Sequence, residues 1–542
     1  MAKWGVLSVL GAAQFLMVLD QAVMNVAISQ LVEDFDTTVT TIQIVIALYA
    51  LVMAGLMLIG GKLGDLWGRR RAFTIGLCIY GAGSALTAAS WSIPSLTFGW
   101  SVLEGIGAAL VLPAMVALVA TNFKGQDRAL AYGVLGGVAG AGIAVGPILG
   151  GWATTELSWR VVFAGEVVVA IGILLGTRLL KETAREGPVP RLDVIGGILS
   201  AAGLGIAVFG VLQASNWGWL APRSSPIEPF GLSLTPFVIA LGLTILAGFR
   251  AWERRREERG EDPLVHLGLL KIPRLRSGVA MLVVQNLVLM GVFFTVPLFL
   301  QIVQGFDALE TGVRMLPASV GLFVAALAGS ALAKRFPARP LVRIGLAIAL
   351  VAVLLLLDTV EAELDNTAFL IAMGVLGVGM GLIVSQLGNV VQSSVEDRDR
   401  SEAGGLQNTA QQLGSSLGTA VLGAIVITGL ISAFTANVAS DPALSKDVEQ
   451  KVEVRVAAGA SFVTTEQVRA AAEEEGLDSA QADRVVDDYS EAQLDALKVA
   501  FLAAALLVLA SFLFTRNLPT KRFDQLQAEA GGYSKAVAGP SP

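Results

Sequence analysis

The stretch TTIQIVIALYALVMAGLMLIGGKLGDLWGRRR, residues 40–71, contains the pattern that decides the fold of this chain. Its first part, residues 40–61, has no Asp, Glu, Lys or Arg. About 20 such mostly apolar residues make a helix long enough to cross the ~30 Å hydrocarbon core of a membrane. Lys62 and the three arginines at 69–71 follow. The stretch therefore predicts a membrane-spanning helix that ends in a basic turn.

The same pattern recurs along all 542 residues, of which 54% are hydrophobic and only 15% are charged. Water-soluble domains carry about 25% charged residues, so this chain lacks the polar surface that a soluble fold needs. The apolar runs lie near 6–31, 40–61, 71–91, 93–122, 128–154, 157–180, 192–214, 228–251, 275–303, 309–333, 340–358, 366–393, 402–436 and 492–515. We therefore expect an all-α polytopic membrane protein with fourteen transmembrane helices.

The basic residues predict how these helices are oriented. Lys and Arg gather in the even-numbered connections, as in 69–71 and 254–256, whereas the short odd-numbered connections hold little beyond Arg160 and Arg223. Short cytoplasmic loops are enriched in Lys and Arg. Since an even number of spans returns the chain to its starting side, we expect both termini in the cytoplasm and a multi-pass protein of the cell membrane.

The division of the chain follows from a weak internal repeat. Small residues and a basic turn follow the apolar run in GGKLGDLWGRRRAF (60–73), and again in GSALAKRFPARPLVRIG (329–345). Transporters commonly arise from such duplicated halves. We expect two pseudo-symmetric six-helix bundles plus an extra central helix pair. The predicted divisions are a first bundle at 1–190, the extra helices at 191–252, a cytoplasmic connection at 253–274, a second bundle at 275–515 and a cytoplasmic tail at 516–542.

The second bundle contains the only long external loop, residues 438–490, which is strongly acidic. Its sequence predicts a helix from Thr464 or Thr465, with Gly476 as its stop. A second helix from about Ser479 is expected to continue into the last span. Either a solvated helical cap or a role in gating or partner binding fits this loop.

Composition excludes several classes of site. The single cysteine, Cys78, and the single histidine, His266, exclude a disulfide framework and a clustered His/Cys metal site. The net charge of −6 gives no reason to expect nucleic-acid binding. No Gly-x-x-x-x-Gly-Lys loop for ATP is present. We therefore expect a non-enzymatic monomer without cofactor or metal, whose partners are a small-molecule substrate and membrane lipids.

Carboxyl groups inside apolar runs are the sharpest candidates for function. Asp20, Glu104 and Glu166 each lie in the middle or external half of a predicted span. A charged side chain at such depth costs several kcal/mol and marks a functional site by default. These acids are candidates for taking up and releasing protons, although a protonated, hydrogen-bonded carboxyl with a structural role is open for each.

Four motifs together resemble the major facilitator superfamily, and within it the fourteen-helix drug:proton antiporter branch. GKLGDLWGRRR (61–71) is similar to the signature between the second and third helices, and FLMVLDQAVMNVA (15–27) to the first-helix motif. GIAVGPILGG (142–151) resembles the antiporter motif, and GGLQNTAQQLGSSLGTAVLGA (404–424) the penultimate helix. The resemblance covers nearly the whole chain, apart from the external loop and the tail after about Arg522.

The resemblance implies roles for particular residues. Asp20 would be a proton-coupling or cation-recognition acid, with Asn25 in the same motif. Where the branch usually has Arg-x-x-Gln-Gly, this chain has Ser101-Val102-Leu103-Glu104-Gly105, and Glu166 stands where asparagine is frequent. The missing arginine puts the usual proton relay in doubt, so Glu104 is a candidate to replace part of it.

Two of the motifs predict moving or sealing parts. A carboxylate at a helix end can pair with arginines in one conformation and release them in the other, which makes a conformational latch; the latch residues are Gly61, Asp65, Gly68, Arg69 and Arg70. Small residues four apart allow helices to approach closely, and a proline favours a kink. The predicted sealing residues of the antiporter motif are Gly142, Gly146, Pro147, Gly150 and Gly151.

The second half offers polar rather than acidic candidates. Side chains of this kind hydrogen-bond across helices or line a cavity. The candidates for a cavity are Gln285, Asn286, Gln301, Arg314, Asn408 and Gln411.

The expected function is proton-coupled export of lipophilic or amphipathic compounds or drugs by alternating access. The buried acids make cationic substrates plausible, but the same acids could serve protons only. A lipid or native-metabolite transporter of the same fold is the first alternative. A non-transporting membrane scaffold or sensor is the alternative of another class.

Overall fold

Every regular element of the described residues is a helix in the computed structural model of this chain. The structure describes residues 2–123, 125–182, 192–333, 335–395, 400–442 and 462–521, and the single positions 444, 446 and 452. Within these residues, thirteen helices are long and apolar enough to cross a membrane. The prediction of an all-helical, multi-pass membrane protein is confirmed.

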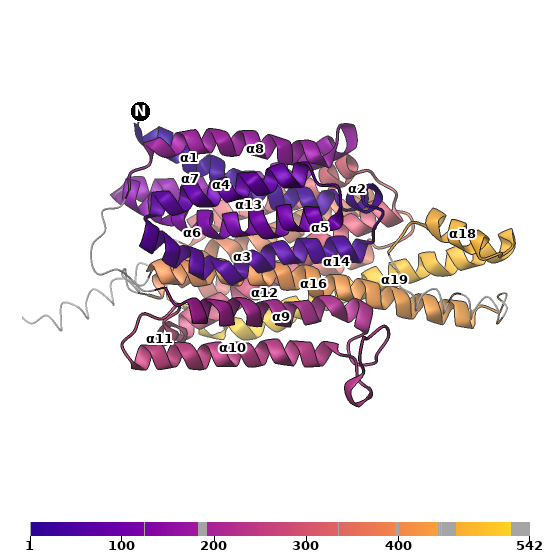
Figure 1. Cartoon of the computed structure of the whole chain (residues 1–542). Helices are drawn as coiled ribbons and strands as arrows, with labels where there is room; N and C mark the ends of the chain where they lie inside the picture. The colour runs from indigo at the N-terminus through magenta and orange to yellow at the C-terminus, as the bar shows by residue number, and fades with distance from the viewer. Residues whose placement is uncertain are drawn as a thin grey trace, which may run out of the picture.

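The first half of the chain forms one group of parallel and antiparallel helices (Figure 1). In this group α1 packs against α7 and α8, α3 packs against α6, and α4 packs against α6 and α8. The elements are α1 (Ala2–Val26), α2 (Ile28–Asp34), α3 (Val39–Trp67), α4 (Arg69–Ala88), α5 (Ile93–Leu96), η1 (Thr97–Glu104), α6 (Gly105–Asn122), α7 (Gly125–Glu156), α8 (Trp159–Gly176) and η2 (Thr177–Leu179).

The last part of the chain forms a second group. Here α12 packs against α16, α15 packs against α13 and α14, and α19 packs against α14 and α16. The elements are α12 (Pro273–Leu298), η4 (Phe299–Val303), α13 (Ala308–Leu332), α14 (Ala338–Asp358), α15 (Asn366–Ser393), α16 (Arg400–Ser440), α18 (Thr465–Glu474), α19 (Ser479–Ser511) and η6 (Phe512–Asn517).

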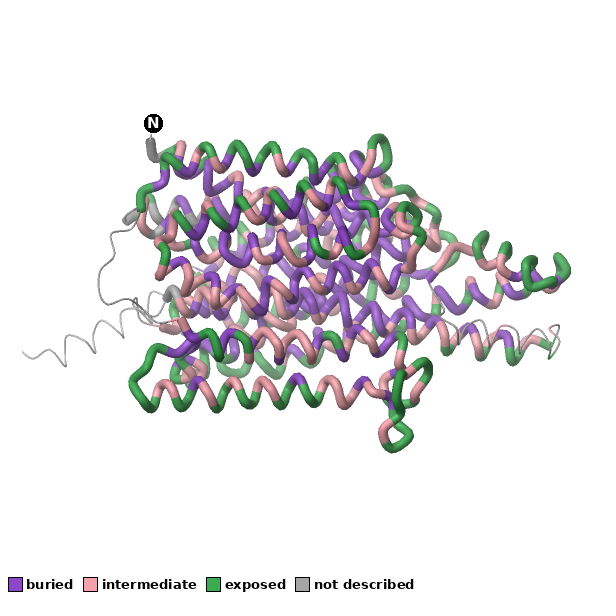
Figure 2. The backbone as a smooth tube through the Cα atoms, viewed as in Figure 1, coloured by how far each residue is buried: buried purple, intermediate pink, exposed green. Residues whose placement is uncertain are grey.

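Two helices that lie between these groups in the sequence form one edge of the molecule. α9 (Val194–Trp217) packs against α3 and α16, and α10 (Thr235–Glu258) packs against α9. η3 (Pro229–Gly231) and α11 (Leu267–Leu270) flank α10. Most of α10 is exposed or half-buried (Figure 2), so its apolar side chains, such as Leu241 and Leu243, are available to lipid. α9 thus bridges the two groups on one side.

One predicted span is more polar than the others. The run predicted at 71–91 is the helix α4, which is not among the thirteen spanning candidates. Three arginines form its first turn, and its sequence also contains Thr74, Tyr80 and Ser84. Its central residues are nevertheless buried, because α6 and α8 cover them.

At one end of the molecule, α16 and α19 continue beyond the other helices and carry α18 (Figure 1); we call it the α18 end, and the opposite one the N-terminal end. The predicted helix start is confirmed, since Thr464 and Gln467 form a capping box. Gly476 follows with a positive φ of 81°, as expected for a helix stop. The predicted second helix is α19. Part of the 438–490 loop (443, 445, 447–451 and 453–461), the 183–191 boundary region and residues 522–542 of the tail lie outside the described residues.

Candidate functional site

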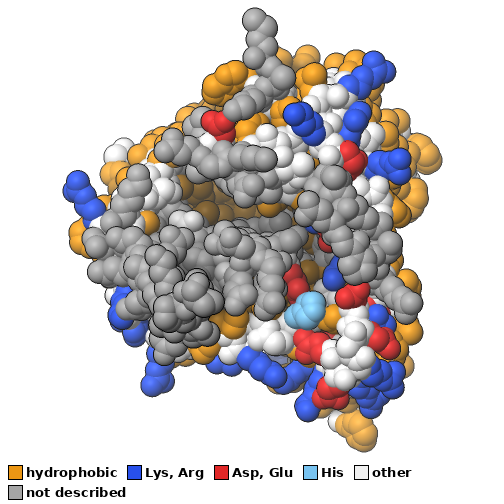
Figure 3. Space-filling model, turned by 90° about the vertical axis from the view of Figure 1, so that its left-hand side faces the viewer, with side chains coloured by type: hydrophobic (Ala, Val, Ile, Leu, Met, Phe, Trp, Pro, Cys, Tyr) orange, Lys and Arg blue, Asp and Glu red, His pale blue; other side chains and the backbone are white. Residues whose placement is uncertain are grey.

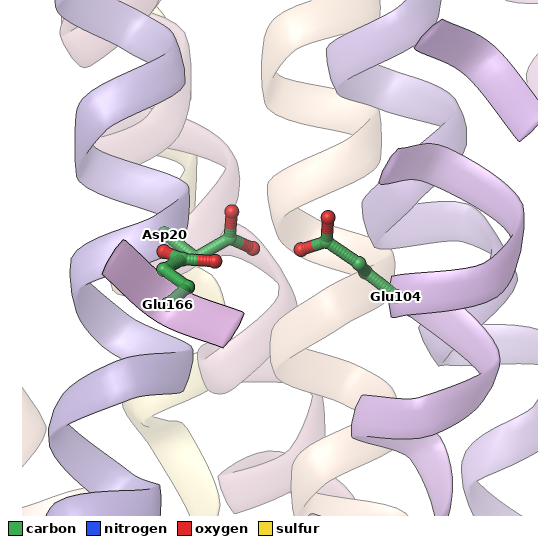
Figure 4. Close-up of side chains that lie close together, drawn as sticks. All are labelled: Asp20, Glu104 and Glu166. Carbon is green, nitrogen blue, oxygen red and sulfur yellow. The ribbon is translucent and has the colours of Figure 1, made fainter. Parts of the chain in front are cut away.

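The three intramembrane acids converge at one place. Asp20 on α1, Glu104 at the end of η1 and Glu166 on α8 each place one carboxyl oxygen within 4.8 Å of the others, and Figure 4 shows their carboxyl groups turned toward one another. At most 2% of any of these residues is exposed. We call this group the acid cluster.

Each carboxyl group of the cluster is held by side chains from neighbouring helices. Trp100 Nε1 donates to Asp20 Oδ1 over 2.7 Å. The hydroxyls of Tyr80 and Ser84 donate to Glu166 Oε2 over 3.0 and 3.2 Å. The Thr87 hydroxyl oxygen lies 3.0 Å from Glu104 Oε1. Since most of these partners lie on α4, that helix serves as the support of the site.

The second oxygen of each carboxyl group has no hydrogen-bond partner among the residues that the structure describes. All three of these oxygen atoms are buried; they are Asp20 Oδ2, Glu104 Oε2 and Glu166 Oε1. The Tyr49 hydroxyl is also buried beside Asp20, and its ring stacks on Trp100 with centroids 4.5 Å apart. The site therefore offers three buried carboxyl oxygen atoms, one from each acid, that could bind something small.

Charge decides what the acid cluster must bind. Two unit charges 4.8 Å apart repel by about 3 kcal/mol at an effective dielectric constant of ~20. Among the described residues, no Lys, Arg or His places a compensating positive charge close to these acids. Three negative charges cannot coexist there. The cluster must hold protons, and its three remaining carboxyl oxygens are also a donor set that could contact one metal cation.

Local backbone structure positions Glu104 and Trp100. Both lie in η1, which has π-helical geometry, and such stretches frequently occur at functional sites. Gly83 on α4 allows this approach, because a Cβ atom there would lie 2.6 Å from Glu104 Cγ and 2.7 Å from the Gly99 carbonyl oxygen. The space around the Glu104 side chain thus exists only because position 83 has no side chain.

Asn25 does not join the acid cluster. Its side chain donates to the Gln21 carbonyl oxygen of its own helix over 2.8 Å. The structure therefore brings the three acids together, whereas Asn25, the fourth predicted coupling residue, lies farther along α1.

The latch residues gather at the N-terminal end of the molecule. Asp65 contacts Arg69 across the turn between α3 and α4. Gly68 lies in this turn with φ 97°, a conformation that favours glycine. Glu182 also reaches the turn and accepts a hydrogen bond from the Arg70 backbone N–H over 3.2 Å. Gly61 lies farther up α3 and faces Pro113.

The antiporter-motif residues lie on two seams of α7. Toward α1, a Cβ atom on Gly142 would lie 3.0 Å from Val18, one on Gly146 would lie 2.4 Å from Ala22, and one on Gly150 would lie 2.9 Å from Val23.

Toward α13, a Cβ atom on Gly151 would lie 2.4 Å from the Ala308 carbonyl oxygen. One on Gly312 would lie 2.1 Å from the Pro147 carbonyl oxygen. The motif therefore joins the two groups of helices as well as α1 and α7.

Further contacts join the two groups near the α18 end. Gln301 Nε2 donates to the Val26 carbonyl oxygen over 2.8 Å, and Gln301 Oε1 accepts from the Ser29 hydroxyl over 2.6 Å. Gln43 Nε2 donates to the Thr419 carbonyl oxygen over 2.9 Å. The Leu309 N–H donates to the Thr155 hydroxyl over 3.2 Å. The opposite end is different, since Figure 3 shows a recess there with hydrophobic side chains at its floor.

The remaining polar candidates occupy different places. Gln285, Asn286, Asn408 and Gln411 lie on α12 and α16, whereas Gln301 belongs to the contacts near the α18 end. Arg314 is half-buried: its guanidinium lies 3.6 Å from the Phe306 ring centroid, and its Nε donates to Oδ1 of the exposed Asn366. Because it stands near the start of α13, Arg314 can reach this outer position.

Sequence reasoning did not identify Tyr49, Tyr80, Trp100 or Glu182. In the sequence, the three aromatic residues resemble ordinary core residues of apolar runs. Only their polar atoms indicate a second role as hydrogen-bonding groups. Glu182 follows the last turn of its span, where an acid resembles an ordinary loop residue.

Comparisons with known proteins agree with this architecture. Residues 10–419 match the sequence profile of the Major Facilitator Superfamily. The chain is similar to a probable actinorhodin transporter of Streptomyces coelicolor, with 32% identity over 86% of this chain and 78% of that protein. It is similar to a puromycin resistance protein of Streptomyces alboniger, with 34% identity over 82% of this chain and 86% of that protein. It is also similar to the multidrug efflux pump LfrA of Mycolicibacterium smegmatis, with 30% identity over 94% of each chain.

Solved structures share the fold. A bacterial homologue of the human lysosomal transporter Spinster, in an inward-facing and unoccupied conformation, has a TM-score of 0.59 at 14% identity and covers 95% of this chain and 98% of that one. The human organic anion transporter MFSD10 has a TM-score of 0.56 at 13% identity, covering 95% and 99%. Profile, relatives and fold coincide over most of the sequence, and the chain belongs to the Major Facilitator Superfamily.

Proposed function

We propose that this protein exports lipophilic or amphipathic small molecules, drugs among them, in exchange for protons by alternating access. The acid cluster carries the proposal, because three carboxyl groups buried together without a cationic partner among the described residues must hold protons, as a site that couples transport to protons has to do. The names of the relatives, which include an antibiotic transporter, a resistance protein and a multidrug pump, support the cargo class.

Protons fit the cluster better than a metal ion does. Ca²⁺ takes 6–8 oxygen ligands and Mg²⁺ demands a near-octahedral set. The cluster leaves three carboxyl oxygens for an ion, one each from Asp20, Glu104 and Glu166. The other oxygens of the three carboxyl groups are engaged by Trp100, Tyr80, Ser84 and Thr87. We therefore assign protons as the coupling ions, with no cofactor and no metal.

Hydrogen-bond counting divides the roles among the three acids. The Thr87 hydroxyl oxygen lies 2.9 Å from the Gly83 carbonyl oxygen and 3.0 Å from Glu104 Oε1. A hydroxyl has one hydrogen, and a carbonyl oxygen can only accept. If the Thr87 hydroxyl donates to the Gly83 carbonyl, its contact with Glu104 can be a hydrogen bond only when Glu104 is protonated and donates to the Thr87 oxygen. Glu104 is then a resident neutral acid.

The coupling proton is left to the other two acids. Asp20 accepts from the Trp100 N–H, and Glu166 accepts from two hydroxyls, so donors are in place for the negative charge on either one. In this account Asp20 and Glu166 share one exchangeable proton. Because they lie on α1 and α8, movements of these helices would change which of the two holds it.

Alternating access fits the contacts between the helix groups. We assign fourteen transmembrane helices, α4 included, as a first bundle at 1–190, an extra pair at 191–252 and a second bundle at 275–515. The basic residues at the N-terminal end (Figure 3) support a cytoplasmic location of both termini in the cell membrane. The contacts near the α18 end then close the external side, and the recess faces the cytoplasm. One chain contains the whole path, so we propose a monomer.

The test uses purified protein in sealed liposomes with an imposed pH gradient of either sign. A more acidic compartment on the external face of the protein should drive substrate into that compartment. Reversing the pH gradient should reverse the direction of substrate movement. Asp20→Asn keeps the side-chain shape but cannot titrate, so it should abolish this response while insertion remains intact. Substrate movement that ignores the gradient in both wild type and Asp20→Asn would contradict proton coupling and favour a uniporter or a scaffold.

A further inference from the structure

A group of amide side chains lies between the two helix bundles. Gln21 Nε2 of α1 donates to Gln412 Oε1 of α16 over 3.4 Å. Asn286 of α12 donates to Gln285 Oε1 over 3.0 Å. A Cβ atom on Gly414 would lie 2.9 Å from Asn286 Cβ, which places α12 and α16 side by side at this level. The amide layer consists of Gln21, Gln285, Asn286, Gln411 and Gln412.

The amide layer and the acid cluster occupy opposite sides of α1. Asp20 and Gln21 are consecutive, and consecutive side chains leave a helix about 100° apart. Asp20 turns into the first bundle and contacts Trp100, whereas Gln21 turns toward the second bundle and contacts Gln412. The acids are buried, while Gln21, Asn286, Gln411 and Gln412 are partly exposed. A molecule held between the bundles would therefore touch amides rather than carboxylates.

The amide layer has unused hydrogen-bonding capacity. Gln285 is 3% exposed, and its Nε2 is buried with no hydrogen-bond partner in the described part of the chain. An orphaned buried donor costs about 1–3 kcal/mol, so it favours a ligand that accepts from it.

The nearest charged groups of α13 and α16 lie toward the two ends of the bundle. Arg314 pairs with Asn366 at an exposed site, and Glu402 contacts His266 near the start of α16. Within the described part of α1, α12 and α16, the only residue of a charged type at this level is Asp20, which turns into the first bundle and contacts Trp100.

We propose that the amide layer is the substrate site and that it selects molecules which are uncharged when bound and carry carbonyl or hydroxyl groups on an apolar frame. Amides both donate and accept hydrogen bonds, so they match such groups without a formal charge. A permanent cation would lose its hydration shell there and gain no counter-charge. This proposal rests on the proposed export function and replaces the expectation of cationic substrates.

The experiment measures binding to the full-length protein in nanodiscs, by tryptophan fluorescence, with two flat aromatic probes. Naphthazarin is a neutral dihydroxynaphthoquinone, and ethidium is a permanent cation. Wild type should bind naphthazarin at least about tenfold more tightly than ethidium. Asn286→Asp keeps the side-chain shape but places a carboxylate in the amide layer, so ethidium affinity should rise by about tenfold or more. Asn216→Asp, at an exposed position at the end of α9, adds the same charge elsewhere and should change neither affinity.

The outcomes separate this inference from the export proposal. If Asn286→Asp and Asn216→Asp bind ethidium equally, the amide layer is not the site, whatever the affinity for naphthazarin. If wild type binds ethidium more tightly than naphthazarin, the selectivity is wrong. Both results would leave proton-driven transport in liposomes intact, since that depends on Asp20. Thermal unfolding of each variant verifies that the fold is retained.

Discussion

Adding a methyl group to Gly151 or Gly312 should force open the seam between α7 and α13, which we propose closes the external side. In the structure, a Cβ atom on Gly151 would lie 2.4 Å from the Ala308 carbonyl oxygen, and one on Gly312 would lie 2.1 Å from the Pro147 carbonyl oxygen. Ordinary contacts of this kind are 3.4–4 Å long. Each Gly→Ala change therefore requires α7 and α13 to separate by about 1 Å or more.

The size of the effect follows from the cost of overpacking. Inserting a methyl group into a closely packed contact costs about 1–3 kcal/mol. That cost falls on the state in which the seam is closed and spares the state in which it is open. Since 1.4 kcal/mol corresponds to a factor of ten, the outward-open population should rise by about 5- to 150-fold in either variant. Gly137→Ala is the matched control on α7, because a Cβ atom at position 137 meets nothing within 4 Å.

The assay is pulsed electron–electron double resonance between spin labels at Leu157 and Val313, which are 57% and 49% exposed near the ends of α7 and α13 that meet at this seam. The single cysteine, Cys78, is first replaced by serine. The Gly151→Ala and Gly312→Ala variants should shift the distance distribution toward longer separations, and Gly137→Ala should match wild type. Identical distributions in all four proteins would refute the assignment of this seam as the external gate.

Three further predictions concern the acid cluster, the external surface and the topology. Glu104→Gln should leave the pH dependence of transport unchanged, because the amide is neutral at every pH, as Glu104 is in this account. Glu166→Gln should displace the pH profile, and equal displacement by both variants would contradict the division of roles. Burial raises the pKa of Asp34, but hydrogen bonds from Trp159 and Arg160 outweigh it and hold this pKa below its usual value. The ionised form then stabilises the folded protein above the ordinary carboxyl pKa of about 4, and this contribution is lost as the pH falls through the lowered value. Asp34→Asn should therefore reduce the melting temperature at pH 7 through a loss of about 1 kcal/mol or less, with no difference in strong acid; a constant difference at all pH values would exclude this linkage. A membrane-impermeant maleimide should label Trp91→Cys in intact cells, in a Cys78→Ser background, and should fail to label Glu257→Cys; the opposite pattern would invert the topology.

The helices were predictable because hydropathy and length are local properties. The apolar run at 192–214 corresponds to α9, and the start at Thr464 and the stop at Gly476 correspond to the ends of α18. The exception, α4, begins with three arginines and depends on its neighbours for burial. A count of apolar runs includes this helix, whereas its own hydropathy does not mark it as a membrane span.

The site was predictable in part. Each of Asp20, Glu104 and Glu166 could be chosen alone, because an acid in an apolar run is costly. Their convergence could not be predicted, since it depends on how α1, η1 and α8 pack and on the space left by Gly83. The same holds for Arg314, whose position near a helix end decides its exposure.

The most direct test of proton coupling applies a substrate gradient and measures the change in pH that it drives. Wild-type protein is reconstituted in liposomes that contain a pH-sensitive dye, without any imposed pH gradient, and an outward gradient of a transported substrate is applied. Coupling is reciprocal, so the substrate gradient should drive protons into the lumen and acidify it, and the Asp20→Asn variant should produce no pH change. Substrate efflux without acidification in the wild type would contradict the central claim.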